Sequence, residues 1–163
     1  MLPVLYNFRH GIELALKEAI RDAASCVRGD GLTDAGWTTA ELDKTLSTSH
    51  AIGRLVQQLN EGLDLLNRFG ARTIDIGEDM EEVLAGLHAL DETGQALRYT
   101  TVKQGTHKAP VLVAARPTAQ EIDLEQLALA LWDAGNRILQ DVCPKLTAYR
   151  EWGEEQNDLR RQP

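Results

Sequence analysis

The sequence has 163 residues, which is enough for one domain with a buried core. Its composition, 43% hydrophobic and 26% charged, is that of a globular protein, and no apolar run approaches the roughly 20 residues of a membrane-spanning helix. The formal net charge of -8 argues against broad binding to nucleic acids, because such binding rests on the neutralisation of phosphates by Lys and Arg.

The start of the chain does not have the pattern of a secretory signal. Met1 leads almost at once into a helical segment with Arg9, Glu13 and Lys17, where a signal peptide would have its apolar region. We therefore expect a cytoplasmic protein without a membrane segment.

The sequence contains no recognisable metal or cofactor motif. Cys26 and Cys143 are isolated and have no nearby pair of histidines, so they predict reduced thiols rather than a disulfide framework or a zinc site. A phosphate-binding glycine loop, an HExxH helix and a nucleophile elbow are also missing. We expect neither a metal ion nor a cofactor.

The first predicted helix begins near Pro3 and ends at Gly29 and Gly31. Its apolar residues follow helical spacing: Leu5, Phe8, Ile12, Leu16, Ala19, Ala23 and Val27. The next stretch is predicted to be a loop with at most one helical turn around residues 39–44.

Three further helices are predicted over residues 48–69, 78–90 and 122–143, each with apolar residues along one side. Pro144 is expected to kink the last of them before a final amphipathic turn at residues 146–152. Residues 153–163 are polar and are expected to form a fraying tail.

A β-hairpin is predicted between the third and fourth helices. LRYTTVK and VLVAAR are short, contain β-branched residues and are separated by the turn-forming QGTHKAP. Residues 93–120 contain no Asp or Glu but include Arg98, Lys103, Lys108 and Arg116. This basic segment either holds a phosphate backbone locally or is an ordinary solvated hairpin.

The predicted fold class is therefore mainly α: a bundle of four main helices with a β-hairpin insertion, in one domain over residues 1–152. The first and last helices are apolar over a wide arc, which so small a bundle cannot cover on all sides. We expect a homodimer, and the alternative is a monomer with unusually apolar helices.

A polar strip interrupts the first helix. Arg9, Glu13 and Lys17 are four residues apart and share one side of the helix, with His10 beside them. The neighbours of the strip are apolar, which favours a covered position in which the charges pair. The strip is either a buried structural network or an active site in which His10, which titrates near neutral pH, stays available.

Four ordered segments resemble a group of bacterial HEPN-like proteins: RHGIELALK, SHAIGRLV, LHALDETGQALRY and IDLEQLALAL. They match an Arg-His-x-x-Glu-Leu-x-Leu-Lys helix, a His helix start, an Asp followed by an aromatic-Arg-Tyr strand, and a closing Ile-Asp helix. The resemblance covers residues 6–139 and implies a compact, usually dimeric helical bundle from a prokaryotic defence or toxin–antitoxin system.

Many HEPN proteins are metal-independent endoribonucleases whose site has an Arg, four to six residues, and then a His. No Arg in this sequence has a His at that spacing, and Arg98 and His107 come closest with eight residues between them. The resemblance therefore implies either an endoribonuclease with an unconventional site or a non-catalytic module that binds a partner protein or a nucleotide.

For the endoribonuclease, the matched positions suggest a replacement set of catalytic residues, namely Arg9, His10, Glu13 and His50. The two histidines would transfer protons and Arg9 would hold the phosphate. Lys17, Arg98, Tyr99, Lys103 and Lys108 would bind RNA. The expected partners are a second copy of the chain, RNA, and a cognate antitoxin or other defence-system protein.

Overall fold

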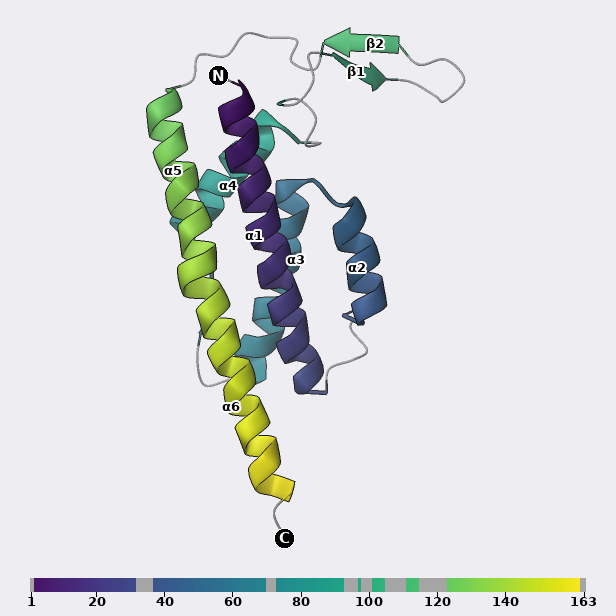
Figure 1. Ribbon diagram of the computed structural model, residues 1–163, viewed down its shortest axis with the longest axis vertical. Helices are drawn as coiled ribbons and strands as arrows, with labels where there is room; N and C mark the ends of the chain where they lie inside the picture. The colour runs from purple at the N-terminus through teal and green to yellow at the C-terminus, as the bar shows by residue number, and fades with distance from the viewer. Residues whose placement is uncertain are drawn as a thin grey trace.

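The computed structural model describes residues 2–31, 37–69, 73–92, 97, 101–104, 111–114 and 123–161 (Figure 1). The elements follow in the order α1 (Leu2–Gly29), α2 (Thr39–Thr48), α3 (Ile52–Phe69), α4 (Glu78–Leu90), β1 (Thr101–Gln104), β2 (Val111–Ala114), α5 (Leu124–Arg137), the π-helical segment η1 (Ile138–Val142) and α6 (Cys143–Arg161).

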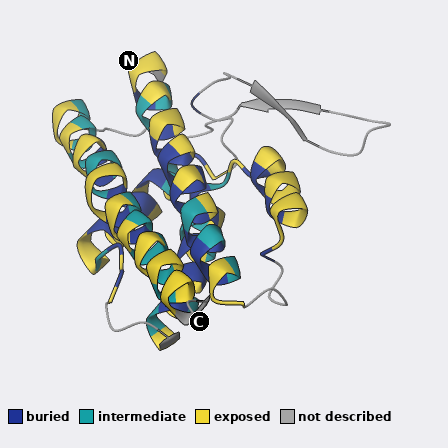
Figure 2. Ribbon diagram, turned by 60° about the horizontal axis from the view of Figure 1, so that its bottom comes forward, coloured by how far each residue is buried: buried dark blue, intermediate teal, exposed yellow. Residues whose placement is uncertain are grey.

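Helix α1 lies at the centre of the bundle and contacts α2, α3, α5, η1 and α6 (Figure 1). The predicted apolar stripe of this helix is confirmed, since all its members are buried except Phe8, which is half-buried. Ala15, Ile20 and Ala24 are also buried, so α1 is enclosed over most of its circumference. Figure 2 shows buried residues on the inner faces of the helices and exposed residues on the outer faces.

Helix α2 corrects the prediction of a loop with one helical turn. It has 10 residues, and it buries Leu42 and Leu46. Because these leucines are four residues apart, they share one side of the helix, and α2 packs against α1. Thr38 and Glu41 have the spacing of a capping box, a signal for a helix start in the sequence, although here the Thr38 hydroxyl donates to the Glu41 carboxylate at 2.6 Å.

The helix predicted over residues 48–69 begins later than expected. Thr48 ends α2, and α3 starts at Ile52. The helix predicted over residues 78–90 coincides with α4, which buries Met80, Leu84 and Leu87 as expected.

Helices α5, η1 and α6 follow one another along one side of the molecule (Figure 1). At the start of α5, the Asp123 side chain accepts a hydrogen bond from the Gln126 backbone N–H at 3.0 Å. Pro144 lies just after η1, in which the Cys143 N–H donates to the Ile138 carbonyl. Since Pro144 has no N–H to donate, the backbone takes one wider turn before it and stays helical.

The expected fraying tail is not what the structure shows, because α6 continues to Arg161. Extending a formed helix costs far less than starting one, so a polar segment can remain helical beyond a packed part. In the described residues, α2 and the 19-residue α6 add to the four main helices that were predicted, so that number is too low.

The predicted hairpin falls mostly outside the described residues. Strands β1 and β2 pair antiparallel, with Thr101 opposite Ala114 and Gln104 opposite Val111. The intervening residues 105–110 and the flanking residues 98–100 and 115–116 are not described, nor are the side chains of the two strands.

The mainly helical class is confirmed. Among the described residues, no helix has both the length and the apolar character needed to cross a bilayer.

Candidate functional site

The carboxylate of Glu13 is the centre of a buried charged network. Arg9 Nη1 donates to Glu13 Oε2 at 2.9 Å, and Lys17 Nζ donates to Oε1 at 2.8 Å. The exposed fractions are 1% for Arg9, 3% for Glu13 and 8% for Lys17. The polar strip predicted on the first helix is therefore covered, and its charges pair at the predicted i,i+4 spacing.

Helix α3 is tied to this network through the residues that precede it. His50 Nδ1 lies 2.9 Å from Glu13 Oε1, and Arg9 Nη2 donates to the backbone carbonyl of His50. Because the ionised Glu13 only accepts hydrogen bonds, Nδ1 must carry the proton. With Nδ1 as the donor, Nε2 is the ring nitrogen that faces away from Glu13, and 55% of the His50 side chain is exposed.

Helix α4 is tied to the network through Asp91, its C-terminal capping residue. Asp91 is 1% exposed, and its Oδ2 lies 3.3 Å from Arg9 Nε. The same carboxylate oxygen accepts from the Leu97 backbone N–H at 3.4 Å. Asp91 was not among the predicted site residues. The sequence does contain a signal for it. Asp91 directly follows the apolar stripe of the helix predicted over residues 78–90, and it belongs to LHALDETGQALRY, one of the four segments that resemble the HEPN-like family.

The charges of the network balance one another. Arg9 and Lys17 supply two positive charges, and Glu13 and Asp91 supply two negative charges, so buried charge is compensated while His50 is neutral. Burial alone would raise the pKa of Glu13, but hydrogen bonds from Lys17, His50 and Arg9 outweigh it and hold the pKa below the ordinary value of 4.5. Glu13 is thus a carboxylate throughout the neutral pH range.

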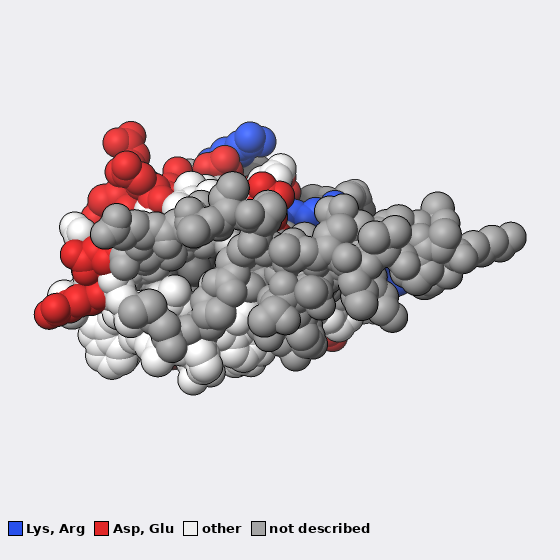
Figure 3. All heavy atoms as spheres, turned by 90° about the horizontal axis from the view of Figure 1, so that it is seen from above, with Lys and Arg blue, Asp and Glu red and all other residues white. Residues whose placement is uncertain are grey.

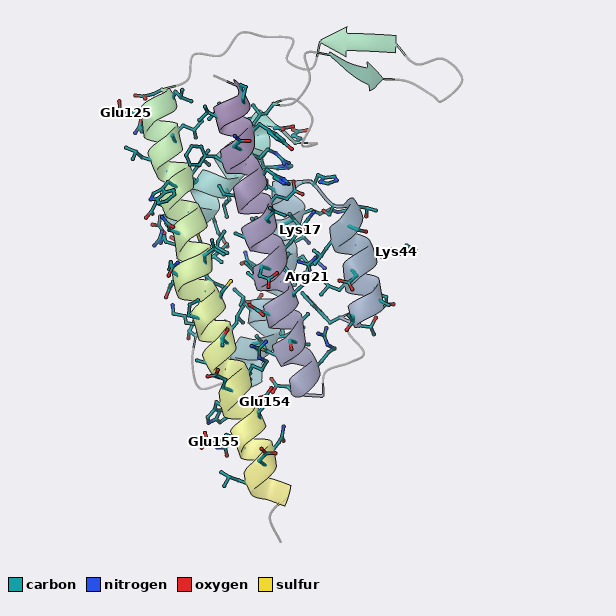
Figure 4. All side chains as sticks on the ribbon, viewed as in Figure 1. Lys17, Arg21, Lys44, Glu125, Glu154 and Glu155 are labelled. Atoms are coloured by element: carbon teal, nitrogen blue, oxygen red, sulfur yellow. The ribbon has the colours of Figure 1, made fainter. Side chains whose placement is uncertain are left out.

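The covered strip ends after Lys17. The next residue at i+4 spacing is Arg21, whose side chain is 48% exposed and lies 3.4 Å from Glu18 and 3.9 Å from Asp43 (Figure 4). Such exposed pairs contribute little to stability. The contrast with Lys17, one turn earlier, marks the end of the covered charged strip on α1.

His10 lies outside the network. It is exposed, and its ring stacks on that of Tyr6 with centroids 5.8 Å apart and planes 8° from parallel. No hydrogen bond or ion pair between His10 and the network is found among the described residues. Of the four predicted catalytic residues, the structure therefore brings together Arg9, Glu13 and His50.

The predicted RNA-binding residues are largely outside the described part of the chain. Arg98, Tyr99 and Lys108 are not described, and Lys103 is described only by its backbone in β1. Lys17 is described, and its ammonium group is paired with Glu13. On the face seen from above, acidic side chains gather at one side of the described surface (Figure 3).

Neither cysteine belongs to a disulfide or a metal centre in the described structure. Both are free thiols, Cys26 buried and Cys143 half-buried. No group of three or more His, Cys, Asp or Glu side chains that would suit a metal ion is found among the described residues.

Comparisons with protein-family models, with curated proteins and with solved structures find no match to this chain.

Proposed function

We propose that the chain is an HEPN-like helical protein of a prokaryotic defence or toxin–antitoxin system that acts by binding a partner and not by cleaving RNA. The observation that supports this is the pairing of Arg9, which was expected to hold the phosphate, and of Lys17, which was expected to bind RNA. Arg9 contacts Glu13, Asp91 and the His50 carbonyl, and Lys17 contacts Glu13.

Binding a phosphate at Arg9 would break these contacts. The guanidinium is 1% exposed, and its removal from the network would take away the cation that contacts both the Glu13 and the Asp91 carboxylate. Metal-independent RNA cleavage needs a cation that is free to stabilise the phosphate in the transition state. The network is better suited to holding α1 against α3 and α4.

In this proposal, the network makes the bundle a rigid scaffold and the function is carried by its outer surface. The candidate partners are a cognate antitoxin or another defence-system protein, and a second copy of the chain. A contribution of the basic segment at residues 93–120 to RNA binding remains part of the proposal, since most of that segment is not described.

The pair formed by His50 and Glu13 favours a second candidate, a metal-independent endoribonuclease. An exposed imidazole whose Nδ1–H is held by a buried carboxylate presents Nε2 as a base, which is the arrangement of many acid–base sites. His50 would accept the proton of a ribose 2′-OH, and Glu13 would stabilise the imidazolium. The group that protonates the leaving oxygen would then be His10 or a residue outside the described part.

An RNA-cleavage assay with EDTA decides between the two candidates. Total cellular RNA is incubated separately with the unmodified chain, with His50→Ala and with His10→Ala. Circular dichroism checks the helix content of each protein. We expect no cleavage by any of the three folded proteins. If the unmodified chain cleaves RNA in EDTA and folded His50→Ala does not, the endoribonuclease is the correct candidate and the non-catalytic binding protein is wrong. Equal cleavage by all three would indicate a contaminating nuclease, which repurification removes.

A further inference from the structure

A hollow of about 450 Å³ lies between α1 and α5, on the side of α1 away from the charged network. Its walls include Phe8, Gly11 and Ile12 from α1, Trp132 and Gly135 from α5, and Leu139 from η1. We refer to this surface as the α1–α5 face. It is independent of the residues discussed above for RNA cleavage.

The lining of the hollow carries no ionisable side chain, and its polar members are the amides Asn7 and Asn136. This is unusual in a chain that is 26% charged. A partner recognised through its charge, such as a nucleic acid or a basic peptide, would find no counter-charge in the hollow. Two copies that each carry a net charge of -8 repel one another over most of their surfaces, so a face without charges is where they can meet.

Large apolar side chains stand exposed along the same helix sides. Trp132 is 62% exposed, Leu139 48% and Val4 46%, and all three line the hollow. Leu129 of α5 is 63% exposed and lies three residues before Trp132, on the same side of that helix. Leu14 of α1 is 53% exposed and lies three residues after Gly11, on the same side of that helix. Exposed apolar residues grouped in this way mark a surface that another molecule covers.

The exposed area on this face is what a stable dimer needs. From those exposed fractions, the five side chains together present about 500 Å² of apolar surface, and an interface is about 60% apolar. If all of this apolar surface were covered, an interface of that composition would bury about 800 Å² per copy, which is the size of a standard stable interface.

The shape of the face also suits a second copy. A Cβ at Gly11 would have nothing within 4 Å, and one at Gly135 would meet only Ile12 Cγ1 at 3.9 Å, so the hollow is open above both glycines. Because the projecting Trp132 and the hollow belong to the same face, a two-fold axis through that face can place Trp132 of one copy over the hollow of the other. The side-chain amides of Asn7 and Asn136 can each donate and accept hydrogen bonds, so each can pair with the same residue of a second copy.

We propose that the α1–α5 face is the site at which a second copy of this chain binds across a two-fold axis, with Trp132 of each copy in the hollow of the other. This rests on the proposed function, in which a second copy is one of the candidate partners, and it names the surface that this copy would cover; it does not depend on whether the chain cleaves RNA.

The test is the molar mass of the complete chain, measured by size-exclusion chromatography with light scattering and by sedimentation equilibrium. The variants are Trp132→Glu in the face and Gly11→Leu in the hollow. The matched control is Trp152→Glu, since Trp152 is 53% exposed on α6 and does not line the hollow. Trp132 is largely exposed within one copy, so its replacement leaves the helical fold intact, and circular dichroism checks this.

We expect twice the chain mass of 18.0 kDa for the unmodified protein and for Trp152→Glu, and 18.0 kDa for Trp132→Glu and Gly11→Leu. A monomeric unmodified chain at about 100 μM would overturn the proposal, a concentration far above the dissociation constant of a standard stable interface. A dimer that survives Trp132→Glu and Gly11→Leu would also overturn it, because the contact would then lie elsewhere. The unmodified chain could also be a monomer that binds an apolar dye, with the dye binding lost in Trp132→Glu. That result would overturn the proposal and show that the face binds an apolar molecule other than a second copy.

Discussion

The ring of His88 occupies the space in which a Cβ at position 53 would lie. A Cβ built on Gly53 would be 2.8 Å from His88 Cδ2 and 3.1 Å from His88 Nε2. Glycine at the start of α3 therefore lets the end of α4 approach closely. The structure places His88 at the contact between these two helices.

Gly53→Ala is expected to lower the free energy of unfolding by about 1 kcal/mol, because the added methyl group displaces the His88 ring. The matched control is Gly86→Ala in α4, where a Cβ has nothing within 4 Å. That substitution is expected to raise stability by about 0.5–1 kcal/mol, since it removes the conformational freedom of an exposed helix glycine. Urea denaturation measures both.

The double variant with His88→Ala tests the cause. If the clash with the ring is responsible, Gly53→Ala should become neutral or stabilising once His88 is replaced by Ala. An unchanged penalty in that background would show that the cost comes from the backbone at position 53.

Removing the charge at the centre of the network should be strongly destabilising. In Glu13→Gln, Arg9 and Lys17 remain buried while a carboxylate that pairs with both of them is gone. We expect a loss of about 3 kcal/mol of unfolding free energy in urea denaturation, which is typical of a broken buried pair.

Arg21→Gln is the control for a pair that is exposed on the same helix. It should change the unfolding free energy by less than about 0.5 kcal/mol. If Glu13→Gln were as mild as this control, the network would not be what holds α1 to α3 and α4.

The stabilisation that comes from Glu13 should depend on pH in the acidic range. The pKa of Glu13 is lowered in the folded protein, so between that pKa and the ordinary 4.5 the unfolded chain binds more protons than the folded one. The contribution is therefore complete above about pH 5 and is lost as the pH falls through the folded pKa. Urea midpoints measured from pH 7 to pH 3 should show the difference between the unmodified chain and Glu13→Gln shrinking at low pH. A difference that stays constant would contradict the lowered pKa.

Both thiols should react slowly in the folded protein. Burial raises the pKa of Cys26 and of Cys143 to about 11, and Cys26 also donates to the Leu146 carbonyl at 3.3 Å. At pH 8 only about 0.1% of each would be thiolate, the reactive form. A thiol-reactive chromogenic disulfide should therefore modify neither cysteine rapidly until urea unfolds the chain. Rapid modification of one thiol in the native protein would show that its surroundings open.

Periodicity located most of the helical structure in advance. The spacing of Met80, Leu84 and Leu87 is enough to place α4, because a helix with one buried side has to repeat its apolar residues every three to four positions. The i,i+4 pairs of Arg9 with Glu13 and of Glu13 with Lys17 were predictable for the same local reason. Helix α2 was missed because only Leu42 and Leu46 mark its buried side.

The sequence by itself determined which residues of α1 are charged, which are apolar and which share a side of the helix. Only the tertiary structure decided that the charged side is covered, and that His50 and Asp91, 37 and 78 positions after Glu13, complete its pairing. Helical spacing is a property of one segment, whereas burial and contacts between distant residues depend on how the other helices pack against that segment. The position of His10 illustrates the difference, since the residue next to Arg9 in the chain is exposed on the surface.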